Sequence, residues 1–322
     1  MFIGIIYALI AGMMWGLVFV SPSLLPEYPP ALQSVGRYLA FGLIALPLAW
    51  LDRRRLAQLS RADWKEALKL AAVGNLLYYL CLASAIQRAG GPLPTMIIGT
   101  LPVVIAITAN RRNVRRDGRL PWRKLAPSLM LIGAGIGCVN HVELNALAQS
   151  TDADPTRYAV GVLFAVAALV CWTWYPLRNA DWLRDHPGRS PTTWATAQGI
   201  ATLPLALVGY IVLWATMAIG DSPFAMPFGP RPQFFVGLML AIGLLASWLG
   251  TLCWNESSQR LPTALAGQLI VFETLAALAY AFILRDRWPE TTTLIGIGLL
   301  IAGVMWAVRI KPQAIAAEPP AA

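Results

Sequence analysis

The sequence has few charged residues: Asp, Glu, Lys and Arg make up 13% of it, whereas soluble domains carry roughly 25%. Hydrophobic residues make up 57%, which is more apolar surface than a compact soluble protein of this length can cover. The apolar residues also run on for longer than a soluble core needs, since crossing a bilayer core takes about 20 of them. The scarcity of charge therefore excludes an ordinary soluble protein and predicts a membrane protein.

Residues that bind metals or catalyse reactions are also scarce. The two histidines, His141 and His186, are far apart in the sequence, so we expect no metal centre and no cofactor. Four cysteines lie singly within apolar runs, where cysteine acts as a small apolar residue: Cys81, Cys138, Cys171 and Cys253. An intramembrane enzyme needs a nucleophile and a base at membrane depth, and the sequence offers no such set.

Ten apolar segments, separated by turn-forming residues, predict an all-α integral membrane protein with ten transmembrane helices. They run approximately over 2–21, 31–50, 66–88, 92–110, 125–142, 158–178, 191–217, 233–255, 262–284 and 291–309. The first segment follows no basic stretch and is too long for a signal peptide, so we expect it to stay in place.

The net charge of +9 lies mainly on one side of the predicted membrane. Of the 25 Lys and Arg residues, 19 fall in the loops after even-numbered spans or in the C-terminal flank, and five fall in the opposite loops. The positive-inside rule therefore places both termini in the cytoplasm. The same distribution explains the charge without a nucleic-acid partner.

The two halves of the chain resemble each other. The segment PTMIIGTL at Pro94–Leu101 recurs as PTALAGQL at Pro262–Leu269, an offset of 168, and Trp15 recurs as Trp172, an offset of 157. We therefore divide the chain into repeats at 1–150 and 151–311, with a disordered tail at 312–322. Each repeat holds five spans, an odd number, so the two repeats are expected to insert in opposite orientations.

Several segments resemble the drug/metabolite transporter superfamily, specifically its EamA-type members. The run ALIAGMMWGLVFV at Ala8–Val20 is similar to that family's first helix, and the glycine-rich runs at Leu131–Val139 and Leu294–Val304 are similar to its fifth and tenth. The run VFETLAALAYAF at Val271–Phe282 resembles its ninth helix, with Thr274 where proline is usual. The resemblance implies a ten-helix fold, alternating access, and export of small metabolites, often amino acids or related compounds.

One acid, Glu273, lies near the middle of the ninth span. An ionised group costs several kcal/mol at that depth unless it is paired or neutralised, so we interpret Glu273 as a proton-coupling or amine-binding site. A purely structural hydrogen bond to a neighbouring helix is the alternative. Arg37, about six residues into the second span, either reaches the interface with its charged end or pairs with an acid or a substrate carboxylate.

Other candidate substrate-binding residues are aromatic or polar side chains on spans 1, 3, 4, 6, 8 and 9, which the resemblance implies as the cavity lining. They are Trp15, Asn75, Tyr78, Tyr79, Thr100, Trp172, Tyr175, Trp248, Thr251, Asn255 and Gln268. Asn179 shares a face with Tyr175, and Tyr280 with Glu273. Arg88 and Glu256, at opposite mouths of the predicted cavity, are candidate gate residues, with solvated helix caps as the alternative.

These observations predict a secondary active transporter in a bacterial-type inner (plasma) membrane. We expect its partners to be a small-molecule substrate and the lipid bilayer, and its state to be a monomer or homodimer. Export of small amphipathic metabolites such as amino acids, with or without proton coupling, is the first hypothesis. An uncoupled facilitator and a lipid-handling membrane protein are the alternatives.

Overall fold

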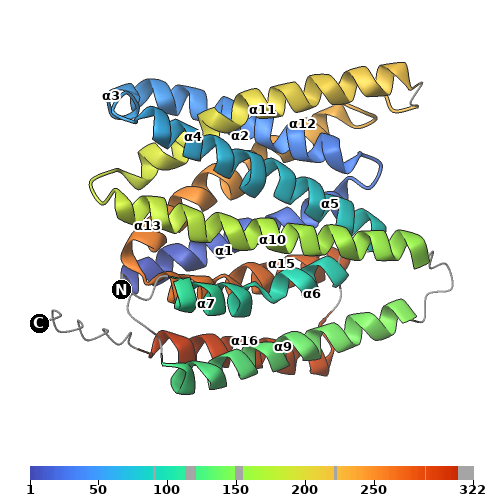
Figure 1. Cartoon of the computed structure of the whole chain (residues 1–322). Helices are drawn as coiled ribbons and strands as arrows, with labels where there is room; N and C mark the ends of the chain where they lie inside the picture. The colour runs from blue at the N-terminus through green and yellow to red at the C-terminus, as the bar shows by residue number, and fades with distance from the viewer. Residues whose placement is uncertain (90–91, 113–120, 149–154, 221–222, 287, 311–322) are drawn as a thin grey trace, which may run out of the picture.

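The structure is a computed structural model that describes residues 1–89, 92–112, 121–148, 155–220, 223–286 and 288–310. Across these ranges every regular element is a helix (Figure 1). Seven helices in the described parts are long and apolar enough to cross a membrane, and a shorter apolar helix covers Thr291–Ala307. The predicted all-α membrane protein is therefore confirmed, whereas the ten-span count stays a prediction. The predicted disordered tail at 312–322 lies outside the described residues.

Helices lie at all five spans predicted for the first half. The first two are α1 (Phe2–Leu24) and α2 (Pro30–Leu51), followed by the short α3 (Arg53–Leu56). The third is one continuous helix made of α4 (Arg61–Lys69), η1 (Leu70–Leu77) and α5 (Tyr78–Ala89). The fourth consists of α6 (Pro92–Gly99) and α7 (Leu101–Arg112), and the fifth is α9 (Trp122–Ala148).

Helices also lie at the spans predicted for the second half. The first two are α10 (Pro155–Asp185) and α11 (Pro191–Ile219). The third is one continuous helix made of α12 (Pro232–Ile242), η2 (Gly243–Leu249) and α13 (Gly250–Arg260). The fourth consists of α14 (Thr263–Leu269) and α15 (Val271–Arg285), and the fifth is α16 (Thr291–Val308).

The third helix of each half contains a π-helical segment, η1 or η2. The Tyr78 N–H reaches the Val73 carbonyl, and the Gly250 N–H reaches the Leu245 carbonyl, five residues back in both cases. Such segments are rare and lie frequently at functional sites, because they displace backbone carbonyls from the regular ladder. The middle of both helices is therefore a candidate functional region.

The fourth helix of each half is broken, at Thr100 between α6 and α7 and at Ile270 between α14 and α15. Pro102 explains the first break, because it has no N–H for the Ile98 carbonyl. The second break forms without proline: the Ile270 carbonyl accepts the Glu273 N–H at 2.9 Å. A proline at position 274 is therefore not needed to open this helix.

Helices from the two halves pack against each other. Helix α2 lies along α11, α9 lies along α16, and α1 contacts both α13 and α15 (Figure 1). The α1–α15 approach is close because Gly16 faces Ala276: a Cβ on Gly16 would lie 2.6 Å from the Ala276 Cβ. This contact brings Trp15 of α1 near the start of α15.

Glycines also determine how closely α9 and α16 pack. Gly133 and Gly137 match a G-x-x-x-G pattern, which predicts close helix packing at those two residues. Within this chain both glycines face open space, so packing at these two residues against another chain stays a prediction. Gly135 makes the contact instead, and a Cβ there would lie 2.6 Å from the Gly296 carbonyl oxygen.

Candidate functional site

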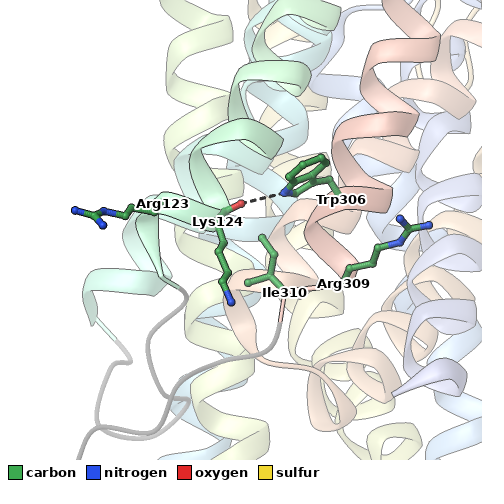
Figure 2. Close-up of a pocket in the computed structure, with 5 residues that line it drawn as sticks. All are labelled: Arg123, Lys124, Trp306, Arg309 and Ile310. Carbon is green, nitrogen blue, oxygen red and sulfur yellow. Dashed lines mark hydrogen bonds between the residues drawn. The ribbon is translucent and has the colours of Figure 1, made fainter.

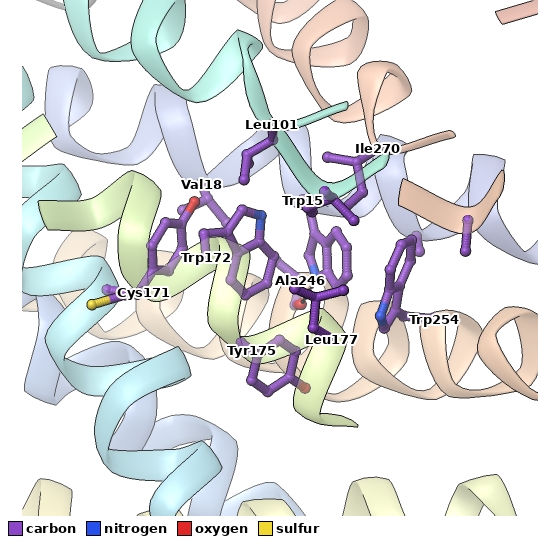
Figure 3. Packing of buried hydrophobic residues seen from close by; sticks show 14 of the residues in the cluster. Trp15, Val18, Leu101, Cys171, Trp172, Tyr175, Leu177, Ala246, Trp254 and Ile270 are labelled. Atoms are coloured by element: carbon purple, nitrogen blue, oxygen red, sulfur yellow. Dashed lines mark hydrogen bonds between the residues drawn. The ribbon is translucent and has the colours of Figure 1, made fainter. Parts of the chain in front are cut away.

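Trp172 of α10 is the centre of a buried aromatic cluster that joins both halves of the chain. Its ring stacks with Tyr78 at a centroid distance of 4.5 Å and with Tyr175 at 5.2 Å. Trp15 meets it edge-on at 4.9 Å, and Trp254 lies 5.2 Å from Trp15. The three tryptophans lie side by side in Figure 3. Helices α1, α5, α10 and α13 thus contribute to one buried aromatic cluster.

Glu273 adjoins this cluster in the first turn of α15. Its side chain is 1% exposed, and Oε2 accepts a hydrogen bond from Trp172 Nε1 at 3.1 Å. The break at Ile270 matters here, since the start of a helix has free N–H groups and a partial positive charge that favour a carboxylate. Among the described residues, no basic side chain lies within the 4.0 Å ion-pair distance of Glu273.

Arg37 is buried in the same region. Its side chain is 4% exposed, so the interpretation that it reaches the membrane interface is wrong. Its Nε donates to Ser247 Oγ at 2.9 Å, and its guanidinium lies 4.6 Å from the Tyr79 ring centroid and 4.9 Å from that of Tyr38. Within the described chain no carboxylate pairs with it.

Several buried polar atoms of this region make no hydrogen bond. They include Nη1 of Arg37, Nε1 of Trp248, and both amide atoms of Gln268. Since the large majority of buried polar atoms in proteins have a partner, such a group indicates where water or a ligand binds.

A chain of side-chain hydrogen bonds extends from Tyr175 toward the end of α13. The Tyr175 hydroxyl donates to Gln198 Oε1 at 2.8 Å, and Gln198 Nε2 donates to Asn179 Oδ1 at 3.1 Å. Asn179 also accepts from Trp194 Nε1 at 2.9 Å and donates to Asn255 Oδ1 at 2.8 Å. Asn179 and Asn255 are therefore interior residues that join α10, α11 and α13.

Sequence reasoning missed the contribution of α11, which lies outside the spans implied as cavity lining. Gln198 and Thr202 are buried in it, and Asn75 of η1 donates to Thr202 Oγ1 at 3.1 Å. Asn75, Tyr78 and Tyr79 thus contact α11, α10 and α2 respectively. Gln198, a polar amide within the apolar run after Pro191, is the sequence feature that could have indicated this contribution.

Three further residues from the sequence analysis, Thr251, Thr100 and Tyr280, are buried or bind the backbone of a neighbouring segment. Thr251 is buried on α13, and the Thr100 hydroxyl donates to the Ile97 carbonyl at the break between α6 and α7. The Tyr280 hydroxyl donates to the Met13 carbonyl at 3.0 Å, which ties α15 to α1.

The two gate candidates make short-range contacts. The Arg88 guanidinium lies 5.0 Å from the Phe164 ring centroid and donates to the Ser84 carbonyl, while Glu256 pairs with Arg260 one turn away. These contacts fit helix caps as well as gates, so the gate role stays a prediction.

At one end of the bundle, side chains of α4 bind side chains of α10. Arg178 binds Glu66 with two hydrogen bonds, Nε to Oε1 at 2.5 Å and Nη2 to Oε2 at 3.1 Å. Trp182 Nε1 donates to Asp63 Oδ1 at 2.9 Å. By the distribution of Lys and Arg, this is the predicted cytoplasmic end.

Comparisons with known proteins agree on the type of protein. A model of the EamA-like transporter family matches residues 2–110. The chain is 57% identical to the inner membrane protein YtfF of Escherichia coli (strain K12) over 310 residues, which cover 96% of each protein. A crystal structure with 18% sequence identity superposes with a TM-score of 0.68 over 94% of this chain and 96% of that one. At that identity, the likeness concerns the fold alone.

Proposed function

Because the chain belongs to the EamA-like transporter family of the drug/metabolite transporter superfamily, we propose that it is a secondary active transporter. Its substrate is a small amphipathic metabolite with an amino group, such as an amino acid, which it exports by alternating access. The name of its 57% identical relative, an inner membrane protein, supports the same location for this chain.

The burial of Glu273 beside Trp172 is the observation that carries this proposal. A carboxylate at membrane depth is costly, and this one has the indole N–H of Trp172 as its hydrogen-bond partner in the described structure. In the proposal, Glu273 binds either the substrate amine or a proton, and the two states alternate during transport. Trp172 orients the carboxylate in both states.

Arg37 supports a substrate that also carries a carboxylate. Its buried guanidinium has a free Nη1 and no acidic partner in the described chain. Arginine suits this role because its planar fork binds carboxylates through two hydrogen bonds. The aromatic surface of Tyr78, Trp172 and Tyr175 suits the apolar part of an amphipathic ligand.

Alternating access in the proposal uses two inverted five-helix repeats, 1–150 and 151–311, with both termini in the cytoplasm. The paired π-helical segments and the paired helix breaks support a shared repeat scaffold. Transport then requires the contacts between α4 and α10, including Glu66–Arg178, to open in one state. The other substrate-binding candidates of the sequence analysis, apart from Trp15, keep their roles in this proposal, as do the gate candidates Arg88 and Glu256.

Proteoliposomes test the proposal directly. Vesicles loaded with a mixture of amino acids and related amino compounds are given a pH gradient, and efflux is measured by mass spectrometry. We expect Glu273→Gln to lower the gradient-driven efflux at least about tenfold, because the amide is neutral in both states. Glu290→Gln, the matched control at the exposed N-cap of α16, should leave efflux near wild type.

The result also separates the two alternatives. If Glu273→Gln leaves gradient-driven efflux unchanged, the coupling role of Glu273 is wrong. If a pH gradient has no effect on the wild type while saturable exchange persists, the protein is an uncoupled facilitator. If no amino compound moves and labelled phospholipid does, the protein handles lipid.

A further inference from the structure

A hollow of ≈ 570 Å³ opens at one end of the α9–α16 pair, away from the aromatic cluster. Its lining includes two basic residues at the start of α9 and one just after α16, and the lining residues are Arg123, Lys124, Trp306, Arg309 and Ile310 (Figure 2). The positive-inside rule assigns this end to the cytoplasmic face. The transport proposal uses none of these residues.

The packing of the two helices places three basic residues around this hollow. Trp306 Nε1 donates to the Lys124 carbonyl at 3.2 Å, which joins the end of α16 to the start of α9. Lys124 and Arg309 lie on either side of Ile310, and Arg123 extends outward from α9 (Figure 2). Throughout the described ranges no carboxylate pairs with Arg123, Lys124 or Arg309. The described residues thus place three positive charges around the hollow and no negative charge in an ion pair with them.

The surface beyond the cations is apolar. Met130 of α9 is 71% exposed and Met305 of α16 is 55% exposed, so both lie on the outward surface of the helix pair. Met130 follows Lys124 by six residues, about 9 Å along a helix. A free phosphate ion would contact the cations alone, whereas a phospholipid would use the cations and the apolar surface together.

From this arrangement we propose that the hollow binds the headgroup phosphate of an anionic phospholipid. Lys124 and Arg309, on either side of Ile310 (Figure 2), hold the phosphate, Arg123 adds positive charge at the edge of the hollow, and Trp306 lies at the interface, where tryptophan is enriched. The acyl chains follow the exposed side of α9 and α16 past Met130 and Met305. Basic pockets between membrane helices on the cytoplasmic side bind anionic headgroups through this combination of charges.

Native mass spectrometry of the purified, delipidated full-length protein tests the site. The probes are dioleoyl phosphatidylglycerol, dioleoyl phosphatidylcholine and inorganic phosphate. We expect the wild type to retain phosphatidylglycerol in preference to phosphatidylcholine. The triple variant R123Q/K124Q/R309Q should bind phosphatidylglycerol at least about tenfold more weakly, because each cation near the headgroup strengthens binding about fivefold.

The matched control is R53Q/R54Q/R55Q, which removes three arginines from the exposed α3, also on the predicted cytoplasmic face. It should keep the lipid preference of the wild type. Equal losses in both triple variants would show a general charge effect and overturn the site. Binding of inorganic phosphate as tight as that of phosphatidylglycerol would show an anion site without a lipid, and absence of any phosphatidylglycerol preference in the wild type would overturn the proposal as well.

Discussion

Trp15 and Trp172 correspond to each other in the predicted repeats, 157 residues apart, and both are buried. Their indole N–H groups bind different partners. Trp15 donates to the Ala246 carbonyl of η2 at 2.9 Å, whereas Trp172 donates to the carboxylate of Glu273 at 3.1 Å. The first hydrogen bond fixes one helix against another, and the second orients an ionisable group.

The difference shows where the two halves diverge. The broken helices α6–α7 and α14–α15 are alike, and at the offset of 168 the residue matching Glu273 is Ile105. Both side chains are 1% exposed. One half therefore keeps an apolar residue where the other has an acid, and Trp172 binds that acid. Trp15 is in this comparison a packing residue and Trp172 a positioning residue for Glu273.

The largest effect is expected from Trp172→Phe. The substitution keeps an aromatic ring in the stack but removes the N–H that Glu273 accepts, and a buried charged group without its partner costs about 3 kcal/mol. Gradient-driven efflux should fall roughly 100-fold, as measured in proteoliposomes. Trp174→Phe on the same helix is the control and should stay near wild type. Efflux of Trp172→Phe equal to that of the control would contradict the positioning role.

Trp15→Phe should act mainly on stability. It leaves the Ala246 carbonyl without the indole donor, a loss of about 1–3 kcal/mol in the free energy of unfolding. Efflux per folded molecule should stay within about twofold of wild type. Unfolding in mixed detergent micelles measures the first quantity and proteoliposomes the second. A collapse of efflux without a loss of stability would mean that Trp15, too, acts in transport.

The smallest effect is the coupling between the two rings. Edge-to-face aromatic pairs contribute about 0.5–1.5 kcal/mol beyond their buried area. A double-mutant cycle with Trp15→Phe, Trp172→Phe and the double variant should give a coupling energy in or below that range, because phenylalanine retains part of the contact. A coupling energy above about 3 kcal/mol would show that the two tryptophans act as one unit and that the contrast between them is not real.

Much of the fold was predictable because a bilayer constrains sequence strongly. Apolar runs identified the segments that become helices, and one acid inside such a run identified Glu273 as a buried residue. The hydrogen-bond partner of Glu273 was not predictable, since it depends on how α10 and α15 pack. The same holds for the burial of Arg37, because its partner Ser247 lies 210 residues away. Pattern matching chose Gly133 and Gly137, whereas inter-helix geometry selected Gly135.

The π-helical segments η1 and η2 have a consequence for how these helices are compared and engineered. An extra residue in a turn shifts the angular phase of everything beyond it by about 100°. A helical wheel drawn across 61–89 or 232–260 as one uniform α-helix therefore misplaces one end. The segments before and after η1 or η2 therefore need separate helical-wheel projections, offset by about 100°. The change in phase lies at the depth of the aromatic cluster. Deleting one residue from the π-helical turn would remove the extra residue together with its wide turn, so the helix would become a uniform α-helix while α5 or α13 kept its orientation.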